Sequence, residues 1–429
     1  MTKEQTLVIC GGRRLEGRLQ VSGNKNAALP MIAAALLTEE TVTLENVPDI
    51  RDVEVMLEAA EDLGVKVRRD PAKGKVELEA KKITKTELDA RMASKVRTSI
   101  LFAGPLLVRC GKVSLPPPGG DAIGHRRLDT HCAGFKTLGA KVEYRADRMT
   151  FSGVLRGRSI VLDEASVTAT ENLMMAAVKC AGEVEIYNAA CEPHVVDLAE
   201  MLNAMGADIR GAGTNRIVIR GVKVLHGAVA RVGCDYIEAM SYVTAAAITG
   251  GAITLENIDA APFRILENAF AKFGVVWKID EAKRRLEYRP HRLKMKYDLG
   301  DTIPTIADGP WPAFPSDLMS ILIVLAAKTR GTCLFFEKMF ESRLYFVDYL
   351  RQMGARIVQC DPHRVVVTGP AKLSGAVVAS PDIRAGIALV IAALAAEGET
   401  RIGRAEVIDR GYVAVEKRLQ SLGAEIERR

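Results

Sequence analysis

The sequence contains no long apolar run, no block of like charges and no low-complexity tract. A membrane-spanning helix needs about 20 consecutive apolar residues, and the apolar stretches of this chain are shorter. The apolar run that follows Met1–Gln5 is also too short for a secretory signal peptide. These absences predict a globular, cytoplasmic protein that does not bind membranes.

Cysteine motifs are absent as well. The eight cysteines form no Cys-x-x-Cys pair, and several of them, such as Cys180, stand inside apolar stretches. Zinc sites and disulfide frameworks have characteristic cysteine spacings that this chain lacks. We therefore expect reduced, buried thiols, no metal site and no cofactor.

Neither sign of charge is in large excess. Lysine and arginine number 59 and aspartate and glutamate 53, which gives a formal net charge of +6. A charge this small and scattered predicts no nucleic-acid binding, although it suits a small anionic substrate. With 429 residues, 26% of them charged and 48% hydrophobic, the chain is long enough for two domains of an ordinary globular enzyme.

What the sequence does contain is a repeat, in which a glycine stands between two apolar residues. Each copy ends an amphipathic stretch with helical spacing and starts a short β-type run. A glycine directly after a helix is the usual left-handed cap, because glycine adopts a positive φ without steric cost. The copies lie 67 to 80 residues apart, so one structural unit is repeated six times. They are Leu63-Gly64-Val65, Leu138-Gly139-Ala140, Met205-Gly206-Ala207, Phe273-Gly274-Val275, Met353-Gly354-Ala355 and Leu422-Gly423-Ala424.

A second helix precedes each amphipathic helix and is apolar on nearly all sides, as is typical of helices in a domain centre. The unit is therefore a buried helix, a strand, an amphipathic helix and a strand. Three units per domain predict an α/β (α+β) fold of two similar domains. The expected buried helices span 26–37, 98–108, 171–181, 240–250, 317–327 and 384–396, and the strands after them 41–47, 112–115, 183–188, 252–258, 332–337 and 400–406.

Polar and basic residues stand at equivalent positions of several units, before the buried helices and before the amphipathic ones. Equivalent loops of a repeat emerge on the same side of a domain, so these groups would gather in one place. Arginine binds phosphate and carboxylate groups bidentately, and helix N-termini attract anions. The pattern predicts an arginine-lined anion site between two three-unit domains.

Eight short motifs along the chain carry a family resemblance. They are VSGNKNAALP, KVRTSILFAGPLL, LPPPGGDAIGHRRLDTH, SVTATENLMMAA, PAFPSD, FESR, DIRAGIALV and IDRGY. In this order they resemble the motifs of the enolpyruvyl transferases, over the whole chain. The resemblance implies an inside-out α/β barrel in each of two domains, residues 24–231 and residues 1–23 plus 232–429, with the active site in the cleft between them.

The resemblance also implies an activity. It is strongest to the members that transfer the enolpyruvyl group of phosphoenolpyruvate to the 3-hydroxyl of UDP-N-acetylglucosamine and release phosphate, the first committed step of peptidoglycan synthesis. Lys25, Arg126 and Arg410 then match residues that grip the phosphate of phosphoenolpyruvate. Arg343 and Arg384 match residues that hold its carboxylate.

Two carboxylates complete the implied chemistry. Asp317 matches the base that takes the proton from the sugar hydroxyl, and Asp382 matches an acid near the reacting carbon. Both have a structural alternative. Pro315-Ser316-Asp317 is a good helix opening, so Asp317 is equally expected as an N-cap, and Lys25 has the alternative of a solvated lysine at a helix start.

The sequence departs from the family pattern at three places that bear on the nucleotide sugar. His125-Arg126-Arg127 replaces a more usual arginine-proline, and Asp235-Tyr236-Ile237-Glu238-Ala239-Met240 replaces a more common version that contains arginine and glycine. Glu164 stands where some relatives have a lysine and others do not. A UDP-sugar remains the expected substrate, with another uridine nucleotide as the alternative. The implied residues are Asn26, Arg97, Arg126, Arg127, Leu128, Asp129, Ser166, Val167, Thr168, Asp317 and Met339.

The largest departure is Asp121, which follows Gly119-Gly120. Most relatives have at this position a cysteine that donates a proton to phosphoenolpyruvate and is alkylated by the epoxide antibiotic fosfomycin. A carboxyl group serves as general acid only if its pKa rises above the usual value near 3.9. The hypothesis is that Asp121 is the general acid and that the enzyme is insensitive to fosfomycin.

Other functions remain as alternatives. A transferase acting on shikimate 3-phosphate would show a serine-rich motif in place of Asn24-Lys25-Asn26. A non-catalytic UDP-sugar sensor would lack Lys25, Asp317 or Arg410, and all three are present. An RNA-end-processing enzyme would need a nucleophilic histidine, and none has a convincing setting. The sequence leaves the oligomeric state, the order of substrate binding and feedback regulation open.

Overall fold

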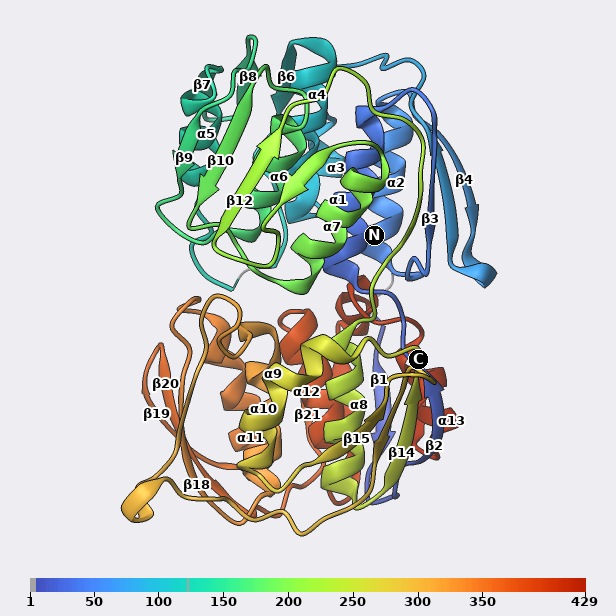
Figure 1. The fold of residues 1–429 in the computed structure, drawn as a ribbon. Coiled ribbons are helices and arrows are strands. Elements are labelled where there is room, and N and C mark those ends of the chain that lie inside the picture. The colour runs from blue at the N-terminus through green and yellow to red at the C-terminus, as the bar shows by residue number, and fades with distance from the viewer. Residues whose placement is uncertain (1–4, 122) are drawn as a thin grey trace. The chain divides into compact units, whose positions relative to one another are not determined.

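The computed structural model describes residues 5–121 and 123–429, which divide into two compact units (Figure 1). The unit that we call the inserted unit contains residues 23–121 and 126–233. The host unit contains the described residues before 23 and after 233, together with the loop residues 123–125. The sequence predicted domain boundaries after residues 23 and 231, and it assigned residues 123–125 to the first domain together with their neighbours in the chain. The first four residues of the segment 1–23 lie outside the described residues.

Each unit has three buried helices at its centre, as the sequence predicted. Nearly every residue of α6 and α8 is buried, because these helices are surrounded by other elements on all sides. The three of the inserted unit are α1 (Lys25–Ala34), α4 (Ala103–Cys110) and α6 (Val167–Ala177). The three of the host unit are α8 (Tyr236–Thr249), α10 (Met319–Lys328) and α12 (Ile383–Leu394).

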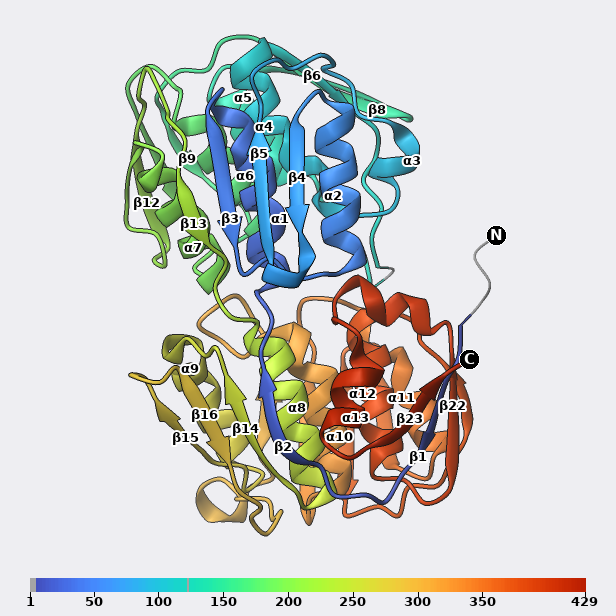
Figure 2. The same cartoon turned by 90° about the vertical axis from the view of Figure 1, so that its right-hand side faces the viewer.

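Sheets cover these helices, one sheet for each repeat, with one face inward. In strands such as β3 and β10 every second residue is buried, which fits a sheet that packs on one face only. In Figure 2 the β3–β5–β4 sheet lies on the surface of the inserted unit, with α1 behind it. This arrangement of central helices and outer sheets is the predicted inside-out α/β barrel.

The sheets of the inserted unit have four, three and four strands. The first runs β13 (Val229–Arg231), β3 (Thr41–Glu45), β5 (Lys75–Glu79), β4 (Lys66–Asp70). The second runs β6 (Lys112–Leu115), β8 (Arg148–Ser152), β7 (Lys141–Arg145). The third runs β9 (Ser159–Val161), β10 (Glu183–Tyr187), β12 (Arg216–Arg220), β11 (Asp208–Arg210).

The three sheets of the host unit have four strands each. The first runs β2 (Glu16–Gln20), β14 (Ala252–Glu256), β16 (Arg285–Tyr288), β15 (Trp277–Asp280). The second runs β17 (Thr305–Ala307), β18 (Gly331–Phe336), β20 (Arg364–Gly369), β19 (Arg356–Asp361). The third runs β21 (Val377–Ala379), β22 (Glu399–Gly403), β1 (Leu7–Cys10), β23 (Glu425–Arg428).

The beginning of the chain completes two sheets of the host unit. β1 lies between β22 and β23 and is antiparallel to both, in the place that a strand of the sixth repeat would take. β2 forms the parallel edge of the β14 sheet. Residues far apart in the sequence therefore form the same layer, which a local pattern does not predict.

The amphipathic helices end at the predicted glycines. All six glycines have positive φ values, from 81° at Gly274 to 105° at Gly139, so the predicted left-handed caps are confirmed. The helices are α2 (Arg51–Asp62), α5 (Asp129–Thr137), α7 (Pro193–Ala204), α9 (Ala260–Ala271), α11 (Val347–Gln352) and α13 (Val415–Ser421), and a short helix, α3 (Ala90–Ala93), precedes the second buried segment.

The structure differs from the prediction in several details, among them the following three. The strand expected over 400–406 ends at Gly403, because Arg404 has a φ of 55° and Ala405–Arg410 forms a 3-10 turn. The buried segment 98–108 is split into the 3-10 turn Arg97–Phe102 and α4. All eight cysteines are free, but only Cys180, Cys234 and Cys333 are buried as predicted. Cys110 and Cys360 are exposed, and Cys10, Cys132 and Cys191 are partly buried.

Candidate active site

In the host unit, two arginines converge on one carboxylate. Arg343 donates from Nη2 to Asp317 Oδ1 at 3.0 Å, and Arg384 donates from Nε and Nη2 to Oδ2 at 3.1 and 2.9 Å. The arginine side chains are 4% and 7% exposed, whereas that of Asp317 is 28% exposed. The cluster therefore presents an ionised carboxylate, held by two buried cations, with part of its surface accessible.

Local structure explains how each member reaches this cluster. Asp317 lies in the 3-10 turn Ser316–Leu318 before α10, and Arg343 begins the 3-10 turn Arg343–Phe346. Neither the turn nor α10 has a side-chain cap, so the alternative that Asp317 is an N-cap is wrong. The aspartate that does cap a helix is Asp382, at the start of α12. Its Oδ1 accepts hydrogen bonds from the backbone N–H groups of Arg384 and Ala385 at 2.8 and 3.0 Å.

Two of the guanidinium nitrogens of Arg343 are not used in hydrogen bonds to the described residues. Its Nε and Nη1 are buried and have no hydrogen-bond partner among the described residues. Glu337 Oε2 lies 3.9 Å from Nε, beyond hydrogen-bond distance, and the guanidinium carbon lies 5.3 Å from the Phe340 ring centroid. An unsatisfied buried donor is costly, so this guanidinium is suited to an acceptor such as the carboxylate of a ligand.

Arg384 contacts Tyr412 of the motif IDRGY as well as Asp317. Its guanidinium lies 5.8 Å from the ring centroid of Tyr412, and Nη1 lies 3.5 Å from the Tyr412 hydroxyl. Burial alone would lower the pKa of Arg384, but Asp317 and Tyr412 outweigh burial and raise the pKa above its usual value. Arg410 ends the neighbouring 3-10 turn and is half-buried, and Met339 is exposed.

A buried carboxyl pair beside this cluster was not predicted from the sequence. Glu337 is fully buried and accepts a hydrogen bond from the Ser316 hydroxyl, whose Oγ lies 2.9 Å from each carboxylate oxygen. Burial and a hydrogen bond with Asp308 raise the pKa of Glu337 well above its usual value, against the opposing charge of Arg343. Asp308 and Glu337 directly follow the parallel strands β17 and β18, which brings them to one edge of the sheet. The sequence feature that could have indicated this pair is an acidic residue directly after each of two strands. It was missed because β17 has only three residues and is not recognisable as a strand from its sequence.

In the inserted unit, Lys25 is held by an acidic partner. Its Nζ lies 2.6 Å from Asp52 Oδ2, and the two side chains are 12% and 5% exposed. Lys25 is therefore not a solvated lysine, although it is the first residue of α1. Asp52 lies in the first turn of α2 and was missed, because nothing in its sequence surroundings indicates which lysine it meets.

Arg97 holds the glycine loop, which is the segment of the motif LPPPGGDAIGHRRLDTH that contains Gly119 and Gly120. Its Nη2 donates to the carbonyl oxygens of Arg126 and Arg127 at 2.6 and 3.0 Å. Burial and the charge of Arg126 lower the pKa of Arg97 to about 10, so it stays cationic at neutral pH. A Cβ at Gly119 would lie 1.7 Å from Ser94 O, and one at Gly120 3.0 Å from Arg97 Cβ. The two glycines are needed for this approach, which sets the position of the adjoining Asp121.

The tip of the same loop packs within the host unit. Ile123 O accepts from the Ser342 N–H at 3.1 Å, and the His125 N–H donates to Glu341 Oε1 at 2.8 Å. A Cβ at Gly124 would lie 2.4 Å from Glu341 Oε2. Residues 341–342 directly precede Arg343, so the loop tip lies against the segment that carries this arginine.

Two of the departures from the family pattern, Arg127 and Glu164, belong to one hydrogen-bond network. Arg127 donates from Nε to Asp129 Oδ2 at 3.1 Å and from Nη2 to Asp163 Oδ2 at 2.8 Å. Thr130 Oγ1 donates to Asp163 Oδ1 at 2.6 Å and lies 3.4 Å from Glu164 Oε1. This network joins residues 127–130 to residues 163–164. The predicted Leu128 directly precedes α5 and is half-buried.

The remaining predicted nucleotide residues of this unit lie at helix starts. Ser166 caps α6 by accepting from the Ala169 N–H at 3.4 Å, and Val167 and Thr168 are the first two residues of that helix. Asn26 is the second residue of α1, and its backbone N–H donates to the capping Asn24 Oδ1 at 2.8 Å. The N–H groups in the first turn of a helix favour anions.

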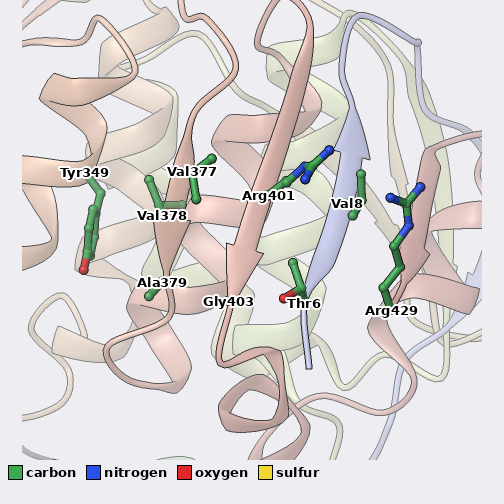
Figure 3. Close-up of a pocket in the computed structure, with 9 residues that line it drawn as sticks. All are labelled: Thr6, Val8, Tyr349, Val377, Val378, Ala379, Arg401, Gly403 and Arg429. Atoms are coloured by element: carbon green, nitrogen blue, oxygen red, sulfur yellow. The ribbon is translucent and has the colours of Figure 1, made fainter. Parts of the chain in front are cut away.

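One pocket lies elsewhere, on the outer face of the β21–β22–β1–β23 sheet (Figure 3). It has a volume of about 570 Å³, and none of its nine lining residues is a predicted site residue. Within the described parts of the chain no helix is both long and apolar enough to cross a bilayer. The same residues contain no group of three or more His, Cys, Asp and Glu side chains arranged to hold a metal ion.

Comparison with known proteins decides the family. The model of the EPSP synthase (3-phosphoshikimate 1-carboxyvinyltransferase) family matches residues 9–419. The chain belongs to this enolpyruvyl transferase family. The family resemblance predicted from the motifs is thus confirmed, as is the status of the chain as a transferase.

Curated relatives refine the match within the family. The chain is 49% identical to UDP-N-acetylglucosamine 1-carboxyvinyltransferase of Borreliella burgdorferi over 422 residues, which are 98% of each chain. It is 50% identical to the protein of the same name from Treponema pallidum over 97% of each chain. The corresponding protein of Bradyrhizobium diazoefficiens is 49% identical over 98% of this chain and 97% of its own.

Solved structures agree on the fold. The enolpyruvyl transferase NikO from Streptomyces tendae superposes with a TM-score of 0.88 at 24% identity over 99% of each chain. EPSP synthase from Acinetobacter baumannii superposes with a TM-score of 0.76 at 19% identity over the full length of each chain. These likenesses show the two-domain enolpyruvyl transferase fold.

Proposed function

We propose that this chain transfers the enolpyruvyl group of phosphoenolpyruvate to the 3-hydroxyl of UDP-N-acetylglucosamine and releases phosphate. The observation that carries the proposal is the sequence identity of 49–50%, over almost the whole chain, to relatives named for this reaction. The Asp317 cluster supports it, because addition of an alcohol to an enol phosphate needs a base beside cations. The reaction would supply the first committed intermediate of peptidoglycan synthesis in the cytoplasm.

The proposed chemistry has two steps. In the first, Asp317 takes the proton of the sugar hydroxyl as its oxygen bonds to C2 of phosphoenolpyruvate, and an acid protonates the methylene carbon C3. In the second, C3 loses a proton, the double bond forms again and phosphate leaves from C2. Asp121 is our candidate for the acid.

The cations have proposed roles in both steps. Arg343 and Arg384 would hold the carboxylate of phosphoenolpyruvate, and the open donors of Arg343 support this assignment. Lys25, Arg126 and Arg410 would stabilise the charge on the departing phosphate. Asp382 is proposed near the reacting carbon, in addition to its place as the cap of the helix that carries Arg384.

The nucleotide would be held mainly by residues of the inserted unit, with Asp317 and Met339 from the host unit. The inserted-unit residues are Asn26, Arg97, Arg126, Arg127, Leu128, Asp129, Ser166, Val167 and Thr168. We propose that the first domain comprises residues 24–231 and the second residues 1–23 plus 232–429.

Another uridine nucleotide is the second candidate substrate. The observation in its favour is the network of Arg127 with Asp129 and Asp163, since the sequence has a charged side chain here where proline is more usual in the family. The test is to mix the purified protein with phosphoenolpyruvate and, separately, UDP-N-acetylglucosamine, other UDP-sugars and shikimate 3-phosphate. Phosphate release and the mass of the acceptor product are measured. Release with UDP-N-acetylglucosamine alone supports the proposal, and release only with another acceptor contradicts it.

Asp121 in place of cysteine gives a separate prediction about fosfomycin. A carboxylate is a poor nucleophile toward an epoxide, and Cys132 does not substitute for a reactive thiol because burial raises its pKa. We expect wild-type phosphate release to survive fosfomycin and the Asp121→Cys variant to be inactivated over time. Asp121→Asn, whose amide N–H is not acidic enough to protonate carbon, should lower kcat by about 10²–10⁴-fold. Covalent labelling of wild-type protein by the drug, seen by mass spectrometry, would contradict the insensitivity.

A further inference from the structure

A buried chain of hydrogen bonds leads to Thr168 from the interior of the inserted unit. Asn172 Oδ1 accepts from the Gly104 N–H at 2.7 Å, and Asn172 Nδ2 donates to Ile100 O at 2.8 Å. The same Nδ2 lies 3.2 Å from His131 Nδ1, and His131 Nε2 lies 3.1 Å from Thr168 Oγ1. His131 and Asn172 are fully buried, and neither was predicted as a site residue.

The partners of Asn172 determine which ring nitrogen of His131 carries the proton. A backbone N–H points at Asn172 Oδ1 and a backbone carbonyl at Nδ2, which fixes the orientation of the amide. The second amide proton of Nδ2 is then donated to His131 Nδ1, which must accept it. In a neutral imidazole the proton therefore lies on Nε2, and this nitrogen donates to Thr168 Oγ1.

The surroundings keep the ring neutral. Burial, with a smaller contribution from the charge of Arg97, lowers the pKa of His131 to about 3. The imidazole therefore has one donor and one acceptor at neutral pH, and both are used inside the protein. Since the ring has no exposed surface, it does not itself touch a ligand.

The packing of two helices holds the chain of hydrogen bonds in place. A Cβ at Gly104 would lie 2.5 Å from Asn172 O and 2.8 Å from Asn172 Oδ1. Only glycine allows α4 to approach α6 this closely, and the approach brings the Gly104 N–H to the amide. The orientation of Asn172 is thus built into the core rather than chosen by a solvent-exposed contact.

We propose that His131 is a positioning residue for nucleotide binding. By donating from Nε2–H to Thr168 Oγ1, it fills one acceptor position of the hydroxyl and leaves the hydroxyl proton to be donated outward. The acceptor is a phosphate oxygen of the bound nucleotide, because an anionic oxygen is the best partner for a hydroxyl donor in the first turn of a helix. This inference rests on the proposed function, in which Thr168 helps to hold a UDP-sugar.

The test is to measure the Kd for UDP by calorimetry in wild-type protein and in two pairs of variants. In the first pair, His131→Asn keeps an acceptor at the position of Nδ1 but does not reach Thr168, whereas His131→Gln brings an amide donor to the position of Nε2. In the second pair, Thr168→Val removes the hydroxyl and Thr168→Ser keeps it. The thermal midpoint of each variant shows whether it is folded.

We expect His131→Asn and Thr168→Val each to raise the Kd for UDP about ten-fold or more, as for loss of a hydrogen bond to a charged group. The double variant His131→Asn/Thr168→Val should bind no more weakly than Thr168→Val alone, because both changes remove one interaction. His131→Gln and Thr168→Ser should stay within about three-fold of wild type, since each keeps the donor.

Other results would overturn the inference. Wild-type affinity in Thr168→Val contradicts it, and so do losses that simply multiply in the double variant. The Thr168 pair decides the question even if His131→Asn does not fold, because Thr168 is only half-buried. If wild-type protein binds UDP but no acceptor supports phosphate release, the proposed function fails while the inference stands on its own measurement. If wild-type protein does not bind UDP, the nucleotide assignment fails and the inference with it.

Discussion

The two units use the same repeat in different ways at the starts of their buried helices. In the host unit, Asp317 is held by two buried arginines, and a buried carboxyl pair lies beside them. In the inserted unit, Arg97 donates to backbone carbonyls, and the buried His131 is neutral and hydrogen-bonded to an amide and a hydroxyl. We propose that the Asp317 cluster of the host unit takes the proton of the sugar hydroxyl, whereas the inserted unit holds the nucleotide and contributes Lys25 and Asp121 to the chemistry.

A large effect on substrate binding is expected when the charge cluster of the host unit is broken. Arg343→Met removes the buried guanidinium whose Nε and Nη1 have no partner among the described residues. We expect KM for phosphoenolpyruvate to rise about 10–100-fold, as for loss of a charged hydrogen bond, while the Kd for UDP stays near the wild-type value. Steady-state kinetics with varied phosphoenolpyruvate measure the first and calorimetry the second.

Arg343→Lys is the matched control, because it keeps the charge and loses the planar fork of donors. Its KM should lie between those of wild type and Arg343→Met. An unchanged KM in Arg343→Met would show that this arginine does not hold the substrate. A large loss of UDP affinity would show that the division between the units is not as described.

A smaller effect is expected on the pH dependence of the free energy of unfolding. It compares the buried Glu337 of the host unit with the buried, neutral His131 of the inserted unit. The pKa of Glu337 is raised in the folded protein by burial and Asp308, so the folded state keeps a proton that the unfolded state has lost. The free energy of unfolding should then fall as pH rises above about 4.5, by at most about 1.4 kcal/mol per pH unit from this group. Glu337→Gln should flatten this dependence, which denaturant unfolding at several pH values measures.

Asp308→Asn gives the independent check, because it removes one cause of the raised Glu337 pKa and should also reduce the slope. The His131 side chain titrates in the opposite sense. Its pKa is lowered to about 3, so its contribution to stability falls as pH drops below about 6.5. If wild type and Glu337→Gln lose stability equally as pH rises, Glu337 does not hold the extra proton.

The fold was predictable from the sequence where the signal is local. The glycine caps and the apolar helices follow from residues within one turn of each other, and all six of each were found. The position of β1 between β22 and β23 depends on pairing across almost the whole chain, which periodicity does not encode.

The candidate site shows the same limit. Asp317, Arg343 and Arg384 were predicted through motifs, and the structure brings these three together. Asp52, Asp308 and Glu337 were missed, because their significance depends on which charged group the fold places beside them. Asp317 and Asp382 also show that a helix-start pattern does not tell whether an aspartate caps the helix. Only the observed N–H contacts separate the two.

The most direct test compares turnover and binding in Asp317→Asn and wild-type protein. Phosphate release from phosphoenolpyruvate and UDP-N-acetylglucosamine is measured beside the Kd for UDP. The account predicts that Asp317→Asn lowers kcat by about 10²–10⁴-fold, as for loss of a general base, with little change in UDP affinity. Wild-type turnover in this variant, or a loss of UDP binding as large as the loss of rate, would contradict Asp317 as the general base and the inserted unit as the main holder of the nucleotide.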